Sequence, residues 1–205
     1  SESLIAGSPF LTVCGLFNLN TLGSASIDDS SIFAVSDGTN YTILWYDYYN
    51  DFSTNYKGYT FAVGSNAEDR VSTGDLSASA NVWQHVCGVM AGNGRKIYLN
   101  GVLKESKSSA PSITVPIPTE GYSRIGSWGG HANFDFNGSL DEVMVVAREL
   151  SAKEINASYN NGVYRLENNF TKLTLGNYSY SAYAIDKTGN FNISSRNVSY
   201  SILPP

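Results

Sequence analysis

Two alternating segments, each with one of the chain's two cysteines near its centre, constrain the fold most strongly. Residues 12–17 and 83–89 both alternate apolar with other side chains, the pattern of strands that bury one face. Soon after the second segment, Asn100 and Gly101 interrupt an apolar run, and both residue types tolerate the positive φ that a two-residue hairpin needs. These segments predict paired antiparallel strands, but they do not identify a ligand.

The composition fits one large β-domain plus a remainder. The 205 residues are 42% hydrophobic, 13% aromatic and only 15% charged, so a sizeable core can form. Short runs rich in Thr, Val and Tyr are separated by Gly, Asn and Ser, as a β-sandwich requires. One helix is expected from residue 151, because Ser151 can cap the amide of Glu154 while Glu154 reaches back. We therefore predict an all-β chain with one short helix.

Further segments give the chain a family resemblance. Together with the cysteine-bearing strands, the segments that carry it are residues 43–45, 59–64, 124–126, 136–143 and 150–155. The chain resembles the laminin G-like domains of the concanavalin A-like jelly-roll class, and its cysteine-bearing strands are most similar to those of pentraxins. The resemblance implies an antiparallel two-sheet jelly-roll sandwich. It also makes the two strands neighbours, which favours a Cys14–Cys87 disulfide over two buried thiols.

The chain changes character after Gly162. Residues 170–202 contain two Tyr-rich or apolar alternating runs around a turn, and they resemble the last strands of immunoglobulin-like or fibronectin-III-like surface repeats. The turn residues that match are Ala184, Asp186, Gly189 and Asn190. Because a lone hairpin is marginal in water, we expect it to dock on the jelly roll, to belong to a larger domain or to complete a sandwich with another copy.

We predict three parts of the chain. They are an N-terminal edge strand or donor strand at residues 1–9, the jelly roll at 10–163 and immunoglobulin-like strands at 164–205.

The charge and the apolar runs exclude two classes of partner. A net charge of −5 gives no electrostatic footprint for nucleic acid or anionic lipid. No stretch approaches the roughly 20 apolar residues that a membrane-spanning helix needs. We expect neither a nucleic-acid partner nor insertion into a membrane.

Glycosylation triplets indicate the compartment. Asn-X-Ser/Thr occurs seven times, although a chain rich in Asn and Ser produces some triplets by chance. Asn137 falls at an expected strand start and Asn156 in the expected helix, so both are set aside. The expected sites of N-linked glycans are Asn40, Asn169, Asn177, Asn192 and Asn197. With the disulfide, they favour a secreted or cell-surface glycoprotein.

No motif indicates catalysis. Glycoside hydrolases on this sandwich carry a Glu-X-Asp-X-X-Glu run on one strand, and the sequence contains none. Asp141 and Glu142 are adjacent, so their side chains should point to opposite faces of a strand. The two histidines, His85 and His131, are far apart in unlike contexts. We expect a protein that is not an enzyme.

The pentraxin resemblance implies a calcium site made of hard oxygen ligands in loops. Asp37 and Asn40, in the turn before the Ile43 strand, would supply the first ligands. The sequence departs from the double site of pentraxins in residues 127–132, which offer few carboxylates. A single Ca²⁺ site therefore remains, and Asn40 cannot be both its ligand and a glycosylation site.

An aromatic and acidic stretch at residues 45–52 is typical of both sugar recognition and protein interfaces. Successive side chains of a strand point to opposite faces, so packing in the sandwich accounts for about half of these aromatic residues. Trp128 adds an aromatic ring in a loop rich in Gly. The expected ligand-binding residues are Trp45, Tyr48 and Trp128.

Two functions from different classes follow. In the first, the chain is a structural subunit of a filament or surface layer and joins copies of itself by addition of its terminal strands. In the second, it is a lectin-like module of an adhesin that binds glycans or other surface proteins, with or without calcium. The incomplete C-terminal sandwich and the lack of a convincing ligand cluster favour the structural subunit.

Overall fold

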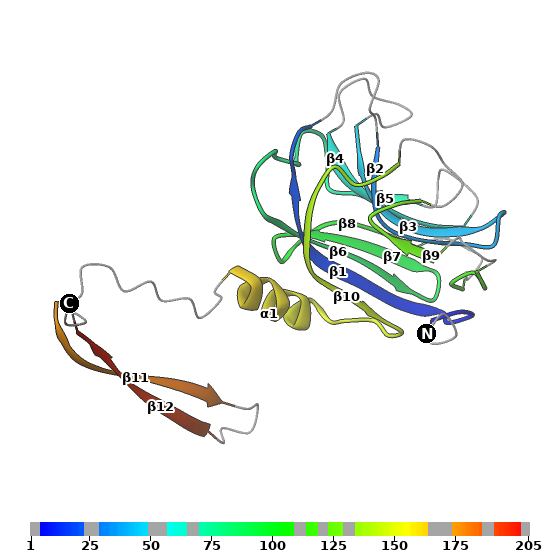
Figure 1. Cartoon of the computed structure of the whole chain (residues 1–205). Coiled ribbons are helices and arrows are strands. Elements are labelled where there is room, and N and C mark those ends of the chain that lie inside the picture. The colour runs from blue at the N-terminus through cyan, green and yellow to red at the C-terminus, as the bar shows by residue number, and fades with distance from the viewer. Residues whose placement is uncertain are drawn as a thin grey trace. The chain divides into compact units, whose positions relative to one another are not determined.

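The structure is a computed structural model, and it describes residues 5–22, 29–48, 57–64, 70–108, 114–118, 123–128, 134–163, 174–185 and 191–201. The chain divides into two compact units, Ser1–Arg165 and Leu166–Pro205. The first unit contains two five-stranded sheets and a helix, and the second contains a two-stranded hairpin (Figure 1).

The first sheet has the order β10-β1-β6-β7-β8, and neighbouring strands are antiparallel. Its strands are β1 Phe10–Leu19, β6 Gln84–Ala91, β7 Gly94–Leu99, β8 Val102–Ser108 and β10 Gly138–Val146. The hairpin predicted at Asn100 and Gly101 joins β7 to β8, and these residues have φ values of 51° and 75°. The Asn100 side chain also accepts a hydrogen bond from the amide of His85, which ties the turn to β6.

The second sheet has the order β5-β4-β3-β2-β9. Its strands are β2 Ser30–Ser36, β3 Tyr41–Asp47, β4 Gly58–Gly64, β5 Arg70–Ser72 and β9 Ser123–Ile125. Pairing is again antiparallel throughout.

The main core fills the space between the two sheets. Along β1, Leu11, Val13 and Phe17 face this core, as the alternation of a strand requires. Contact between the sheets is close at Gly88, where an added Cβ would overlap the ring of Phe61 from the opposite sheet. The prediction of an all-β, two-sheet jelly roll with one short helix is confirmed.

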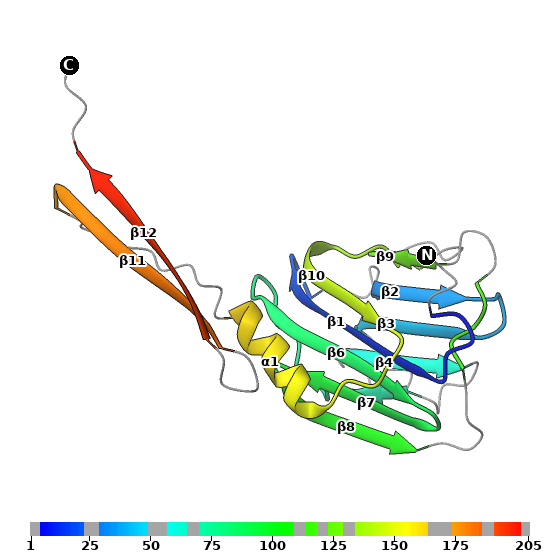
Figure 2. The ribbon, with the colours of Figure 1, turned by 90° about the horizontal axis from the view of Figure 1, so that it is seen from below.

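A second cluster lies on the outer face of the first sheet. Cys14 and Cys87 are directly opposite in the β1–β6 register and form the expected disulfide. Helix α1, Ala152–Val163, covers this face (Figure 2), and Ile155 packs into the cluster with both cysteines. The helix begins as predicted, because the Ser151 hydroxyl accepts from the Glu154 amide while the Glu154 carboxylate accepts from the Ser151 amide.

The residues before β1 are already used inside the first unit. The amide of Gly7 donates to the carbonyl of Val115, and the amide of Val115 donates to the carbonyl of Ser8. Ile5 packs against the main core. These contacts give the described part of this segment a role within its own unit.

The second unit is a regular hairpin of β11 Gly176–Ile185 and β12 Phe191–Tyr200. Its register runs without a bulge from Gly176↔Tyr200 to Ile185↔Phe191. Apolar side chains of β12 are exposed, among them Ile193, Val198 and Tyr200.

Among the residues that the structure describes, no helix has the length and the apolar character that a membrane-spanning helix needs.

Candidate functional site

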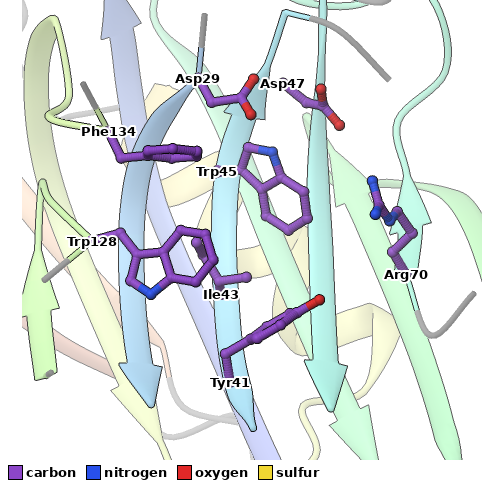
Figure 3. Close-up of a pocket in the computed structure, with 8 residues that line it drawn as sticks. All are labelled: Asp29, Tyr41, Ile43, Trp45, Asp47, Arg70, Trp128 and Phe134. Carbon is purple, nitrogen blue, oxygen red and sulfur yellow. The ribbon is translucent and has the colours of Figure 1, made fainter. Parts of the chain in front are cut away.

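A pocket lies on the outer face of the second sheet, the face that points away from the main core (Figure 3). Alternation along β3 directs Ile43 and Trp45 to this face, whereas Leu44 and Tyr46 enter the core. We call the hollow the β3 pocket. The residues that line it are Asp29, Tyr41, Ile43, Trp45, Asp47, Arg70, Trp128 and Phe134.

Ile43 lies at the floor of the β3 pocket, and small residues flank it. Ile43 pairs with Ala34 on β2 and with Ala62 on β4, so a short side chain lies on each side of it. The three side chains pack together with Trp45 as a separate apolar cluster. Because the two alanines reach little above the sheet, the larger neighbours rise around a hollow with a volume of about 160 Å³.

Aromatic rings form the walls. The ring of Trp128 lies 5.2 Å from that of Phe134 and 5.6 Å from that of Tyr41, both in edge-to-face geometry. A backbone hydrogen bond holds Phe134 against the sheet, since its carbonyl accepts from the amide of Ser31. Rings from β3 and from two separate loops therefore meet over one floor (Figure 3).

Two carboxylates occupy one end of the β3 pocket (Figure 3). Oδ1 of Asp29 accepts a hydrogen bond from the Tyr48 amide at 3.0 Å, and Oδ2 of Asp47 accepts one from the Thr60 hydroxyl at 3.2 Å. The charge of these carboxylates also acts on Tyr46, whose side chain lies in the core. Burial raises the pKa of Tyr46, and the nearby Tyr48 and the two carboxylates raise it further. This end of the pocket is rich in hydrogen-bond acceptors.

A cation lies at the side of the pocket. The guanidinium carbon of Arg70, from β5, lies 5.8 Å from the centre of the Trp45 ring, which is the range of a cation–π contact. The backbone carbonyl of Arg70 accepts from Lys107 of the facing sheet edge. Arg70 and Trp45 thus meet at this side of the pocket, and both line it (Figure 3).

The structure separates the three aromatic residues that we expected to bind a ligand. Trp45 and Trp128 line the same pocket. Tyr48 is almost completely buried in the main core, with Lys57 Nζ 5.4 Å from its ring centre. Residues 45 and 48 are three positions apart, so on a strand they face opposite sides.

Sequence reasoning missed several residues of the pocket: Asp29, Tyr41, Ile43, Arg70 and Phe134. One signal was available, because Tyr41, Ile43, Trp45 and Asp47 follow the two-residue period of a single strand face. Asp29 and Phe134 had no such signal, since loops bring them to the pocket from distant parts of the chain.

The expected calcium ligands lie in the turn between β2 and β3. Oδ1 of Asp37 accepts from the amides of Thr39 at 2.8 Å and Asn40 at 2.7 Å, and Oδ2 accepts from Asn40 Nδ2 at 3.2 Å. Hydrogen bonds, first from the Asn40 amide and then from the Thr39 amide, hold the pKa of Asp37 below its usual value. The carboxylate therefore closes the turn, and calcium binding by Asp37 and Asn40 stays a prediction.

The described residues contain one group of three side chains with metal-ligand atoms close together, namely Cys14, His85 and Cys87. Its two sulfur atoms are joined in the disulfide. His85 is buried beneath α1, with Nε2 3.2 Å from the Ser158 hydroxyl, and burial lowers the pKa of His85 to about 4. This group is a structural cluster under the helix.

The expected glycosylation sites remain predictions. Asn177 and Asn197 are exposed on the same face of the hairpin, and Ser199 donates a hydrogen bond to Asn177 Oδ1. Asn192 pairs with Ala184 in the register of the hairpin. Asn169 lies outside the described residues.

Comparisons with known proteins agree with this fold. A family model for the concanavalin A-like lectin and glucanase superfamily, of the laminin G type, matches residues 11–156. A search of curated protein sequences found no match.

Three solved structures illustrate the likeness. Domain 4 of AbnA, an extracellular GH43 arabinanase of Geobacillus stearothermophilus in complex with arabinotriose, is 16% identical with a TM-score of 0.57, over 75% of this chain and 68% of that one. The CBM40 of the Ruminococcus gnavus IT-sialidase, bound to α2,3-sialyllactose, is 16% identical with a TM-score of 0.58, over 75% and 84%. A heptameric SAP-like pentraxin of Limulus polyphemus is 13% identical with a TM-score of 0.54, over 95% and 85%. At these identities the likeness establishes a shared fold.

Proposed function

This chain belongs to the concanavalin A-like lectin and glucanase superfamily, and we propose that it acts there as a non-catalytic, extracellular carbohydrate-binding module. The ligand-binding site of the proposal is the β3 pocket. The ligand is one sugar residue of a larger glycan, because a hollow of about 160 Å³ is smaller than the roughly 300–1,000 Å³ of pockets that enclose drug-sized ligands.

The observation that carries the proposal is the combination of aromatic walls with two carboxylates on an open sheet face. A sugar ring presents C–H groups on its faces, which pack against indole and phenyl rings. Its hydroxyl groups lie at the ring edge and need hydrogen-bond acceptors, for which carboxylates are strong partners. Trp45 and Trp128 supply the first kind of contact, and Asp29 and Asp47 supply the second.

The arrangement of the carboxylates supports binding rather than hydrolysis. Glycoside hydrolysis uses two carboxyl groups that flank the scissile bond. Asp29 and Asp47 instead lie together at one end of the pocket (Figure 3), each accepting a hydrogen bond from the protein. Both are therefore held as acceptors.

The fold relatives support the same function. Two of the three structures named above contain a bound oligosaccharide, arabinotriose in one and sialyllactose in the other. The Cys14–Cys87 disulfide fits an oxidising, extracellular compartment. N-linked glycans at Asn40, Asn177, Asn192 and Asn197, and at Asn169, remain part of the proposal for this compartment.

Self-assembly through terminal strands is the competing expectation. Its support is the exposed apolar side of the hairpin, where Val198 and Tyr200 are about half exposed. Against it, Gly7 and Ser8 already bond to Val115 within the first unit, so a donor role for the N-terminal segment would require these bonds to break. The contacts in the β3 pocket that support carbohydrate binding are more numerous than those that support self-assembly through terminal strands.

A glycan array tests the proposal. The protein should bind a restricted set of glycans, and Trp45→Ala or Trp128→Ala should reduce binding at least tenfold, since aromatic contacts of this kind dominate binding sites. Trp83→Ala is the matched control, because Trp83 is 46% exposed and does not line the pocket.

Two outcomes would contradict the proposal. One is an array on which no glycan binds above background. The other is loss of binding in Trp83→Ala with full binding in both pocket variants. Repeating the array with Ca²⁺ and with a chelator decides whether Asp37 and Asn40 hold a calcium ion that binding needs.

A further inference from the structure

We infer that the dithiol form of the chain, in which Cys14 and Cys87 are free thiols, binds one Zn²⁺ ion through these two sulfurs and the imidazole of His85. The dithiol form exists before the disulfide closes, and a dithiol reductant restores it. The structure shows the oxidised form, in which the two sulfurs are joined. The zinc site lies on the outer face of the first sheet and is independent of the β3 pocket and of the proposed carbohydrate function.

The register of β1 and β6 brings the three side chains to one face of the first sheet. Cys14 lies directly opposite Cys87, with their Cα atoms 4.1 Å apart. His85 precedes Cys87 by two residues, so its side chain points to the same face. Because the ladder of the sheet fixes these positions, the two sulfurs still face each other beside the imidazole when the bond between them is open.

The distances between the ligand atoms suit a zinc ion. Sγ of Cys87 lies 4.0 Å from Nδ1 of His85, and the ligand atoms of Cys14, His85 and Cys87 all lie within 4.8 Å of one another. With Zn–S bonds of about 2.3 Å and Zn–N bonds of about 2.0 Å in tetrahedral geometry, the ligand atoms of a zinc site are roughly 3.5–4 Å apart. A small shift of the side chains therefore brings all three atoms to one ion.

The chemistry of the ligands and their surroundings also favours zinc. Two thiolates and an imidazole are ligand types that zinc prefers over the hard oxygen ligands of Ca²⁺. The three ligand residues are buried, and Tyr98, Leu150 and Ile155 pack around the cysteines. An apolar shell of this kind limits the access of solvent to the ion.

Helix α1 supplies an outer partner for the imidazole. The Ser158 hydroxyl lies 3.2 Å from Nε2 of His85, which leaves Nδ1 for the metal. A hydrogen bond to the second ring nitrogen fixes the orientation of a metal-bound imidazole. The Tyr159 ring lies 5.9 Å from the His85 ring, between their centres. Three protein ligands leave the fourth position of the tetrahedron to a water molecule.

Two steps form the site from the oxidised chain. The dithiol reductant passes two hydrogen atoms to Cys14 and Cys87 as their S–S bond breaks, and it is itself oxidised to a disulfide. Zn²⁺ then replaces the proton of each thiol, so that two zinc–sulfur bonds form and two protons go to the solvent. No electrons move in the second step, because Zn²⁺ has no redox chemistry.

Zinc titration of the two redox forms tests the inference. The full chain is reduced by dithiothreitol in urea and refolded under argon without the reductant, and the oxidised chain is refolded in parallel. Each form is then titrated with Zn²⁺ in competition with a chromophoric chelator. The reduced chain should bind one ion about a hundredfold or more tightly than the oxidised chain, because only the reduced chain offers thiolates. A pH indicator should report two protons released for each ion bound.

Three variants assign the site to residues. His85→Leu should weaken zinc binding by the reduced chain about tenfold or more, since loss of an outer partner alone costs about 10–100-fold in affinity. Ser158→Ala should weaken it about tenfold. His131→Ala is the matched control and should leave the zinc affinity unchanged, because His131 is the only other histidine of the chain and lies outside β1 and β6. Urea unfolding of the oxidised form, which needs no metal, verifies that each variant folds.

Three outcomes would overturn the inference. Equal zinc affinity of the two redox forms would show that the cysteines are not ligands, and full affinity in His85→Leu would show that the imidazole is not one. The third outcome is a reduced chain that Zn²⁺ does not stabilise against urea, because an ion bound to the folded state must raise the free energy of unfolding. None of these outcomes bears on the glycan array, which tests the β3 pocket.

Discussion

The two sheets of the sandwich differ in what covers their outer faces. On the first sheet, helix α1 lies across the outer face, and Ile155 packs against the Cys14–Cys87 disulfide. On the second sheet, the outer face carries Trp45 and Asp47 and is hollowed into the β3 pocket. Both faces bear apolar side chains, but the chain's own helix covers only the first.

The polar groups of the two faces show the same difference. Beneath α1, His85 faces the Ser158 hydroxyl, so a polar side chain of the sheet meets one of the helix. In the β3 pocket, Asp29 and Asp47 instead lie at one end of a hollow. The covered face stabilises the fold, whereas the hollowed face is the one that we propose recognises a ligand. Each prediction below tests one side of this division.

The largest effect is expected from the disulfide. Replacing both Cys14 and Cys87 by Ala removes a bridge over 73 residues, and the chain-entropy account of such a loop gives a loss of about 4 kcal/mol. Urea unfolding of the oxidised protein and the double variant measures it. Glycan affinity should be unchanged wherever both proteins are folded. A loss below about 1 kcal/mol would show that the covered face does not depend on the bridge.

Tyr48 should behave as a core residue rather than a ligand contact. Tyr48→Ala should lower the free energy of unfolding by about 3 kcal/mol, because it opens a cavity in the main core. Glycan affinity below the unfolding temperature should stay within threefold of the wild type. Trp128→Ala should show the reverse, with weak binding and a small change in stability. Weak binding in Tyr48→Ala together with normal binding in Trp128→Ala would contradict the assignment of stability to the core and of binding to the hollowed face.

Acid should weaken the covered face through His85. Burial lowers the pKa of His85 to about 4, whereas the unfolded chain titrates near 6.5. Below pH 6.5 the unfolded state binds a proton that the folded state does not, so stability falls until about pH 4 by about 3 kcal/mol.

Urea unfolding at a series of pH values between 7 and 4 measures this loss. The same series on His85→Gln supplies the control, because that variant lacks the titrating ring. If the free energy of unfolding depends on pH equally in the two proteins, the loss of stability in acid does not come from His85.

The smallest effect is expected at the start of α1. Ser151→Ala removes the hydroxyl that accepts from the Glu154 amide, and loss of such a cap typically costs about 1 kcal/mol. Chemical denaturation measures the change, with Ser199→Ala in the hairpin as a control that leaves α1 untouched. A stability equal to the wild type would show that packing of Ile155 alone holds the helix.

Local chemistry in the sequence predicts much of the fold. Alternation identified β1 and β6, Asn100 and Gly101 identified the β7–β8 turn, and Ser151 with Glu154 identified the start of α1. Each is a signal between residues close in sequence. The register that places Cys14 opposite Cys87 involves distant strands, and the family resemblance supplied it.

The site is less predictable because it is assembled from distant segments. Trp45 and Trp128 were identified as aromatic residues in suitable surroundings, and the pocket includes both. Asp29 reaches the pocket from the start of β2, and Phe134 from the segment before β10, positions that no local pattern reveals. Tyr48 was grouped with Trp45 because the two are close in sequence, although the two-residue period of a strand places them on opposite faces.

A ¹H–¹⁵N NMR titration that follows the indole signals of the three tryptophans tests whether the β3 pocket binds the ligand. The titrant is the neutral oligosaccharide that binds best on the array. The account predicts that the signals of Trp45 and Trp128 shift together and saturate at the same ligand concentration, while that of Trp83 stays in place. A titration that moves the Trp83 signal and leaves both pocket tryptophans unchanged would contradict the account.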